Sequence, residues 1–189
     1  DFDLYKKLNH KAVIFGKIDQ ISSNVSNVYI YIYDVNSQKS LYQKKVRVHN
    51  GGFRRIAHFL SDKIYEVFLG TSGGFDTKLA YVSVTKNYKD ELIYKLEISD
   101  SDGFNNQTVV KSLKPILSPS WSPDQTQLAY ISLKNGKAEA FVIKPYEKST
   151  PFKLPSLDGI VSEPSWHPNG ESVLLTLSSA GLNKYDIKT

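Results

Sequence analysis

Residues 70–74 read Gly-Thr-Ser-Gly-Gly and fit the pattern Gly-x-Ser-x-Gly. In many hydrolases this pattern holds a nucleophilic serine in a sharp turn that follows a strand and opens a helix. The surrounding periodicity predicts the opposite order, with a helix before Gly70 and a strand after Gly74. We therefore expect Ser72 not to be a nucleophile and the chain to have no enzymatic activity.

Two aspartates near the middle of the chain are the first candidates for metal ligands. Asp100 and Asp102 precede Gly103 as in part of a calcium-binding loop, but residues 107–110 supply neither a further ligand nor a glutamate. A hairpin turn around Asp102 and Gly103 is the favoured interpretation. There is no cysteine and the histidines are scattered, so we expect no metal and no other cofactor. The four histidines are His10, His49, His58 and His167.

Basic residues are concentrated in the first part of the chain. Residues 1–70 contain 11 Lys and Arg against 6 Asp and Glu, whereas the remainder contains 13 of each kind. The densest basic run, residues 44–55, is interrupted by apolar residues, which favours a solvated face over a nucleic-acid site. Tyr29, Tyr31 and Tyr33 could stack on a single-stranded nucleic acid, but alternate strand positions facing one core explain them without a ligand. We expect no nucleic-acid partner.

Membrane insertion is also not expected. No apolar run approaches the roughly 18 to 20 residues that a membrane-spanning helix needs. The N-terminus does not resemble a signal peptide, and the chain begins at Asp1 rather than Met. We therefore expect a chain that has been processed or cut.

The elements that would position these residues fall into two groups. Residues 12–18, 28–35 and 41–48 have the β-branched, aromatic or alternating character of strands. From Phe53 the apolar residues recur at spacings of three and four, which predicts a helix that ends at Gly70 as its C-terminal cap. Residues 1–74 are thus predicted to be part of an α+β domain. The helical positions are Phe53, Ile56, Ala57, Leu60, Ile64, Val67 and Phe68.

Beyond Gly74 the helical period does not return. Short strand-like segments alternate with turn residues, a spacing typical of a sandwich, barrel or propeller. The predicted strands are residues 78–85, 91–99, 108–112, 128–133, 138–144 and 172–177.

A repeat narrows these possibilities. Residues 118–125 (Ser-Pro-Ser-Trp-Ser-Pro-Asp-Gln) recur as residues 163–170 (Glu-Pro-Ser-Trp-His-Pro-Asn-Gly), so the two tryptophans are 45 residues apart. Each copy is followed by an apolar strand, 128–133 in the first and 173–178 in the second. A period of 40 to 45 residues with several short strands per unit is that of a propeller blade.

The residues of the repeat suit such a blade. Proline lacks an N–H group, so Pro119 and Pro164 fit the start of a strand, and the large indoles of the two tryptophans fit between neighbouring blades. A turn follows, in which Gln125 replaces the glycine of the second copy. A residue other than glycine with positive φ costs about 1 kcal/mol, so we expect this turn to be weaker.

The repeat resembles the TolB family, whose propeller motif is Pro-x-Trp-x-Pro-Asp-Gly followed by Leu-Ala-Tyr. Residues 56–66 are similar to the family's last helix before the propeller, residues 78–82 to its first propeller strand, and residues 99–105 to its Ser-Asp-x-Asp-Gly-Tyr-Asn turn. The resemblance covers nearly the whole chain.

The resemblance implies a periplasmic, non-enzymatic scaffold of the Tol-Pal system, which maintains the integrity of the outer membrane. It implies an α/β domain followed by a six-bladed propeller that binds the lipoprotein Pal at its mouth. The second partner, TolA, binds an N-terminal segment that is absent from these residues. We therefore expect an incomplete α+β domain over 1–74 and an incomplete propeller over 75–189.

The resemblance further divides the propeller part into a closing blade (75–116), which takes a strand from the C-terminus, a blade (117–158) and a partial blade (159–189). By resemblance, the segments before each tryptophan form the rim that binds Pal, and Glu163 is singled out because its carboxylate could meet a basic group. The alternative is an accessory propeller of a serine peptidase or another hydrolase. The expected Pal-binding residues are Leu117, Ser118, Pro119, Ile160, Val161, Ser162, Glu163 and Pro164.

Overall fold

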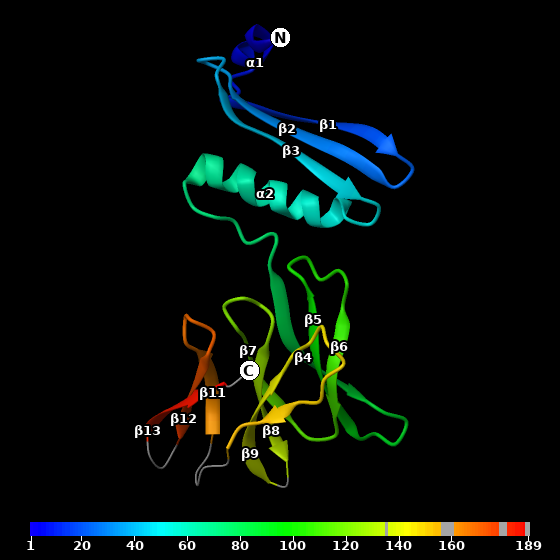
Figure 1. Cartoon of the computed structure of the whole chain (residues 1–189), viewed down its shortest axis with the longest axis vertical. Coiled ribbons are helices and arrows are strands. Elements are labelled where there is room, and N and C mark those ends of the chain that lie inside the picture. The colour runs from blue at the N-terminus through cyan, green and yellow to red at the C-terminus, as the bar shows by residue number, and fades with distance from the viewer. Residues whose placement is uncertain (135, 156–160, 178–180, 188–189) are drawn as a thin grey trace. The chain divides into compact units, whose positions relative to one another are not determined.

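The computed structural model describes residues 1–134, 136–155, 161–177 and 181–187 (Figure 1). The chain forms two compact units, Asp1–Thr77 and Lys78–Thr189. No helix among the described residues is long and apolar enough to span a membrane.

The first unit is a three-stranded antiparallel sheet with two helices (Figure 1). The predicted strands and the predicted long helix are all present, and the short first helix is additional. The elements are α1 (Phe2–Lys7), β1 (Ala12–Ser22), β2 (Val25–Asp34), β3 (Ser40–His49) and α2 (Phe53–Leu69), and the sheet order is β1-β2-β3.

The two faces of this sheet differ, and the expectation that the three tyrosines of β2 face the core is wrong. Side chains alternate along a strand, and the buried ones on β2 are Ile30 and Ile32. Tyr42, which lies next to α2, is opposite Ile32 on β3 and shares its face. The tyrosines therefore lie on the face opposite α2.

These tyrosines form a stacked ladder. The ring of Tyr31 lies 4.9 Å from that of Phe15 and 6.5 Å from that of Tyr29, measured between centroids. The ammonium groups of Lys17 and Lys45 lie 5.8 and 5.4 Å from the Tyr29 ring centroid. The rings therefore lie against one another, and two cations lie near the Tyr29 ring.

The segment that follows α2 is held against the helix. Gly70 ends α2 in the left-handed region (φ 73°), as predicted, and its N–H donates to the Glu66 carbonyl at 2.8 Å. The Asp62 carboxylate accepts the backbone N–H groups of Phe75 and Asp76 at 2.7 and 2.9 Å. A Cβ atom at Gly73 would come within 3.1 Å of the Asp62 Cα, so glycine is needed there for packing.

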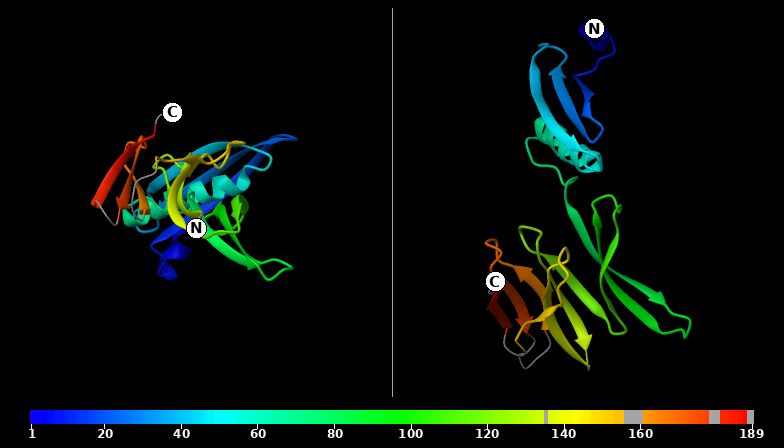
Figure 2. Two further views of the ribbon diagram at one scale, coloured as in Figure 1. Left: turned by 90° about the horizontal axis from the view of Figure 1, so that it is seen from below. Right: turned by 45° about the vertical axis from the view of Figure 1, so that its right-hand side comes forward.

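The second unit consists of antiparallel sheets with the strand orders β4-β5-β6, β10-β9-β8-β7 and β11-β12-β13 (Figure 2). The first sheet contains β4 (Lys78–Lys86), β5 (Leu92–Asp100) and β6 (Gln107–Ser112). The second contains β7 (Ile116–Trp121), β8 (Leu128–Lys134), β9 (Lys137–Ile143) and β10 (Phe152–Lys153). The third contains β11 (Val161–Trp166), β12 (Ser172–Leu177) and β13 (Gly181–Asp186).

Two apolar cores hold these sheets together, and β8 contributes to both. Its even-numbered residues Leu128 and Tyr130 pack in a core with Leu96 and Ile98 of the first sheet. Its odd-numbered residues Ala129 and Ile131 pack in a core with residues of the third sheet. All four are at most 3% exposed, so β8 is covered on both faces, which explains its continuous apolar sequence.

Candidate protein-interaction surface

The rim segments expected to bind a partner fall on β7 and β11, the first strands of their sheets. Pro119 and Pro164 lie in the fourth position of these six-residue strands, not at the start as predicted. The register against the next strand shifts between Leu117 and Ser120, and again between Ser162 and Ser165. Each proline thus sits at a β-bulge, where it removes no ladder hydrogen bond.

The residue before each proline has an unusual backbone. Ser118 has φ 49° and Glu163 has φ 50°, so both occupy the left-handed region that disfavours side chains. These positions correspond in the repeat, and each belongs to the expected binding set. Backbone strain of this kind costs about 1 to 3 kcal/mol and is concentrated at sites that contact ligands and partners.

The bulges leave a mixed surface exposed. Ser118 and Glu163 are exposed, and Leu117 is an exposed aliphatic side chain at 45%. Pro119 and Ser162 are half-buried. The surface therefore combines an apolar side chain, a hydroxyl group and one carboxylate.

The other expected residues are less available. Val161 and Pro164 are buried, and Val161 packs in the core between the second and third sheets. Ile160 lies outside the described residues. The side chains that can contact a partner directly are therefore those of Leu117, Ser118 and Glu163.

The two strands are fixed relative to each other. β11 packs against β7, β8 and β9. The Trp166 indole Nε1–H donates to the Ser120 carbonyl of β7 at 2.9 Å, and the ring packs on the core between the two sheets. The predicted role of this tryptophan between neighbouring sheets is confirmed, and it joins the two bulged strands.

The turn after each tryptophan contains a residue with positive φ, as predicted. Gln125 has φ 57° where the second copy has Gly170 at φ 75°. In the first copy the Asp124 carboxylate accepts hydrogen bonds from the Ser122 and Thr126 hydroxyls at 2.6 and 2.7 Å. Hydrogen bonds from the Ser122 and Thr126 side chains and from the Thr126 backbone N–H hold the pKa of Asp124 below its usual value.

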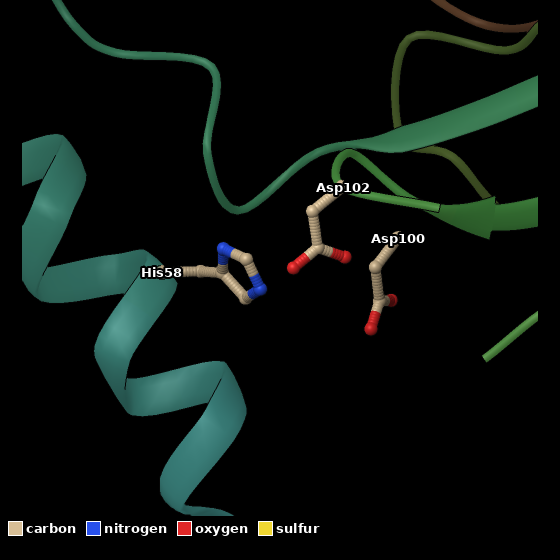
Figure 3. A group of neighbouring side chains, drawn as sticks. All are labelled: His58, Asp100 and Asp102. Carbon is tan, nitrogen blue, oxygen red and sulfur yellow. The ribbon is translucent and has the colours of Figure 1, made fainter. Parts of the chain in front are cut away.

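The aspartates of the considered calcium loop belong to the turn between β5 and β6. The Asp100 carboxylate accepts from Lys78 Nζ and from Asn105 Nδ2, and its backbone N–H donates to the Phe104 carbonyl. Figure 3 shows Asp100 and Asp102 beside each other in this turn. The hydrogen bonds are those of a structural turn, as the sequence analysis favoured.

The serine of residues 70–74 lies in no nucleophile elbow. α2 precedes this segment and β4 follows it, which is the order that the periodicity predicted. Gly70 caps the helix and Gly73 packs on Asp62, so backbone conformation and close packing account for these two glycines.

The left-handed backbone of Ser118 and Glu163 was not anticipated from the sequence. Neither residue is a type that favours this conformation, and the residue before a proline usually adopts an extended one. The available signal was the proline inside a strand pattern in both copies, because a proline within a sheet implies an edge or a bulge.

A family model described as "TolB beta propeller domain" matches residues 65–187. The chain belongs to the TolB family. The Tol-Pal system protein TolB of Ruthia magnifica subsp. Calyptogena magnifica is 55% identical over 181 residues, which are 96% of this chain and 43% of that protein. The TolB of Vesicomyosocius okutanii subsp. Calyptogena okutanii is 51% identical over 180 residues, which are 95% of this chain and 42% of that protein.

The crystal structure of TolB from Acinetobacter baumannii matches the fold. The TM-score is 0.84 at 30% identity, and the match covers 100% of this chain and 47% of that chain. The predicted fold class, an α+β domain followed by an incomplete TolB-type propeller, is confirmed. The chain spans less than half the length of these relatives.

Proposed function

We propose that this TolB-family chain is part of a non-enzymatic periplasmic scaffold that binds Pal through the bulged strands β7 and β11 and acts with TolA in maintaining the outer membrane. Family membership supports the Tol-Pal assignment, because the relatives described above are named Tol-Pal system proteins. The observation that carries the binding surface is the repeated left-handed residue, Ser118 and Glu163, at equivalent bulges of two packed strands.

The geometry suits recognition of a protein. The bulges interrupt the ladder at Ser118 and Glu163, and Leu117, the residue before Ser118, is exposed. Interfaces combine an apolar centre with polar groups that fix the partner's orientation. A carboxylate in this position favours a partner with a basic side chain, and a charge pair at the interface sets specificity and association rate.

Calorimetric titration of the full-length protein with purified Pal tests this proposal. We expect Glu163→Lys to weaken binding at least about tenfold, which corresponds to about 1.4 kcal/mol, because it places a cation where the partner's cation would lie. The far-ultraviolet circular dichroism spectrum should not change, since the Glu163 side chain is exposed.

The matched control is Glu147→Lys, which makes the same charge reversal at an exposed glutamate between β9 and β10. This variant should bind Pal as the wild type does. Equal weakening by both variants would show that the effect arises from net charge. If the wild type does not bind Pal, Pal is not the partner, and an accessory propeller of a hydrolase becomes the favoured function.

A further inference from the structure

The sheet of the first unit carries its stacked tyrosine ladder on the face opposite α2. The ladder consists of Tyr29, Tyr31 and Tyr33, and Phe15 of β1 lies opposite Tyr31. The Tyr31 ring makes an interplanar angle of 2° with that of Tyr29 and 21° with that of Phe15. Because side chains stand roughly perpendicular to a sheet, rings stacked in this way direct their edges away from it. The edge of an aromatic ring is electropositive, so the ladder favours an anion.

Cations flank the ladder on both sides. Lys17 of β1 and Lys45 of β3 are both opposite Tyr29 in the strand register. Their ammonium groups lie 5.8 and 5.4 Å from the centroid of the Tyr29 ring. Arg47, two residues after Lys45, lies on the same face, and both side chains are exposed. This face therefore presents three cations around the ladder.

Asp19 is the one acidic residue of β1, β2 and β3 that shares this face. Its carboxylate lies 3.0 Å from Lys17 Nζ, and the side chains of Asp19 and Lys17 are 36% and 64% exposed. An ion pair this exposed is weak, because water screens it. The face consequently keeps an excess of positive charge, which disfavours a second copy of the same face and favours an acidic partner.

The apolar part and the spacing of the ladder indicate the kind of partner. Phe15 is 49% exposed, so apolar surface lies beside the cations. A protein segment can supply both acidic and apolar side chains, and tyrosine and arginine are the residue types that most often dominate protein interfaces. The Tyr29 and Tyr31 ring centroids are 6.5 Å apart. Alternate side chains of an extended chain repeat at about 6.6 Å, so an extended segment stays in register with the ladder.

We propose that this face binds an extended, acidic segment of a partner protein, with its carboxylates between the cations and its apolar side chains against the exposed aromatic ring of β1. The proposal concerns the first unit and does not depend on binding of Pal by β7 and β11. The surface consists of Phe15, Lys17, Tyr29, Tyr31, Lys45 and Arg47.

Fluorescence anisotropy of the full-length protein with a labelled synthetic peptide tests this proposal. The peptide alternates Glu and Leu over about nine residues, which span about 30 Å when extended. We expect saturable binding that weakens at least about tenfold when Gln replaces every Glu of the peptide. Raising the NaCl concentration from about 0.05 to about 0.5 M should also weaken it, because salt screens exposed charges.

Variants of the protein locate the binding face. Lys45→Glu should weaken peptide binding at least about tenfold without changing the far-ultraviolet circular dichroism spectrum, because this side chain is exposed. The matched control is Lys44→Glu, since Lys44 is exposed but lies opposite the buried Ile30, on the other face of the sheet. This variant should bind the peptide as the wild type does. Asp19→Asn should tighten binding about twofold, because it removes the acidic group of the face.

Three results would overturn the proposal. The first is the absence of saturable binding of the acidic peptide by the wild type, and the second is equal binding of the peptide in which Gln replaces Glu. The third is equal weakening by Lys44→Glu and Lys45→Glu, which would assign the effect to net charge. A single-stranded DNA of similar charge that binds more tightly than the peptide, and loses binding in Lys45→Glu, would overturn it in favour of a nucleic-acid site.

Discussion

Three residues other than glycine hold left-handed backbone conformations in the repeated motif. Ser118 and Glu163 do so at equivalent bulges, which suggests that the strain belongs to the proposed binding surface. Gln125 does so in a turn where the second copy has Gly170. The left-handed conformation of Ser118 and Glu163 occurs in both copies, at exposed residues. That of Gln125 occurs in one copy only, and glycine at this position would relieve the backbone strain.

Replacing Gln125 with glycine should stabilise the protein. A side chain at φ 57° costs about 1 kcal/mol, and Gln125→Gly should raise the free energy of unfolding by about this amount in urea denaturation. The reverse change, Gly170→Gln, should lower it by a similar amount, because its Cβ has room, with Pro123 Cδ at 3.8 Å, but an unfavourable φ. Unchanged stability in both variants would show that the turns relax freely.

Tyr130 should make the protein sensitive to alkali. Burial raises its pKa to about 12 from the usual value near 10. Between these values the unfolded chain loses the phenol proton while the folded chain keeps it, so the free energy of unfolding should fall as pH rises from 10 to 12. The decrease should reach about 2 kcal/mol at pH 11.5. Urea denaturation from pH 8 to 11.5 measures it.

The control is Tyr130→Phe, which keeps the ring that stacks on Phe141 with centroids 5.5 Å apart. This variant should lose less stability than the wild type over the same pH range. Identical pH profiles would assign the effect to other tyrosines.

At the scale of the elements, a single carboxylate holds the segment that connects α2 to β4. Asp62 accepts two consecutive backbone N–H groups, at Phe75 and Asp76, and thereby holds residues 71–77 on the helix. Asp62→Ala removes both acceptors, and limited proteolysis should then cut this segment at least about fivefold faster. Asp76→Ala, in the same segment, should leave the rate unchanged. Equal rates in all three proteins would mean that other contacts hold the segment.

The strands and the long helix could be predicted because they rest on local patterns. The helical period ended at Gly70, and the apolar run of residues 128–133 predicted a strand. The bulges at Ser118 and Glu163 could not be placed, since they depend on register with the neighbouring strand. The face of the β2 tyrosines was missed for a similar reason, because alternation alone does not say which face a helix covers.

At the scale of the molecule, the sheets of the second unit bury their apolar residues against neighbouring sheets. The cores lie between sheets, and Trp166 joins the third sheet to β7 of the second. This dependence on neighbours is typical of propellers and explains why β7 and β11 of two sheets come together. The candidate surface is therefore a property of several blades, and its residues are 45 positions apart in sequence.

Hydrogen–deuterium exchange of the full-length protein, with and without purified Pal, tests the central claim most directly. If β7 and β11 form the binding surface, Pal should slow exchange in residues 116–121 and 161–166 and leave the first unit's β1 and β2 unchanged. Protection confined to other parts of the protein, with these two strands exchanging as before, would contradict the account.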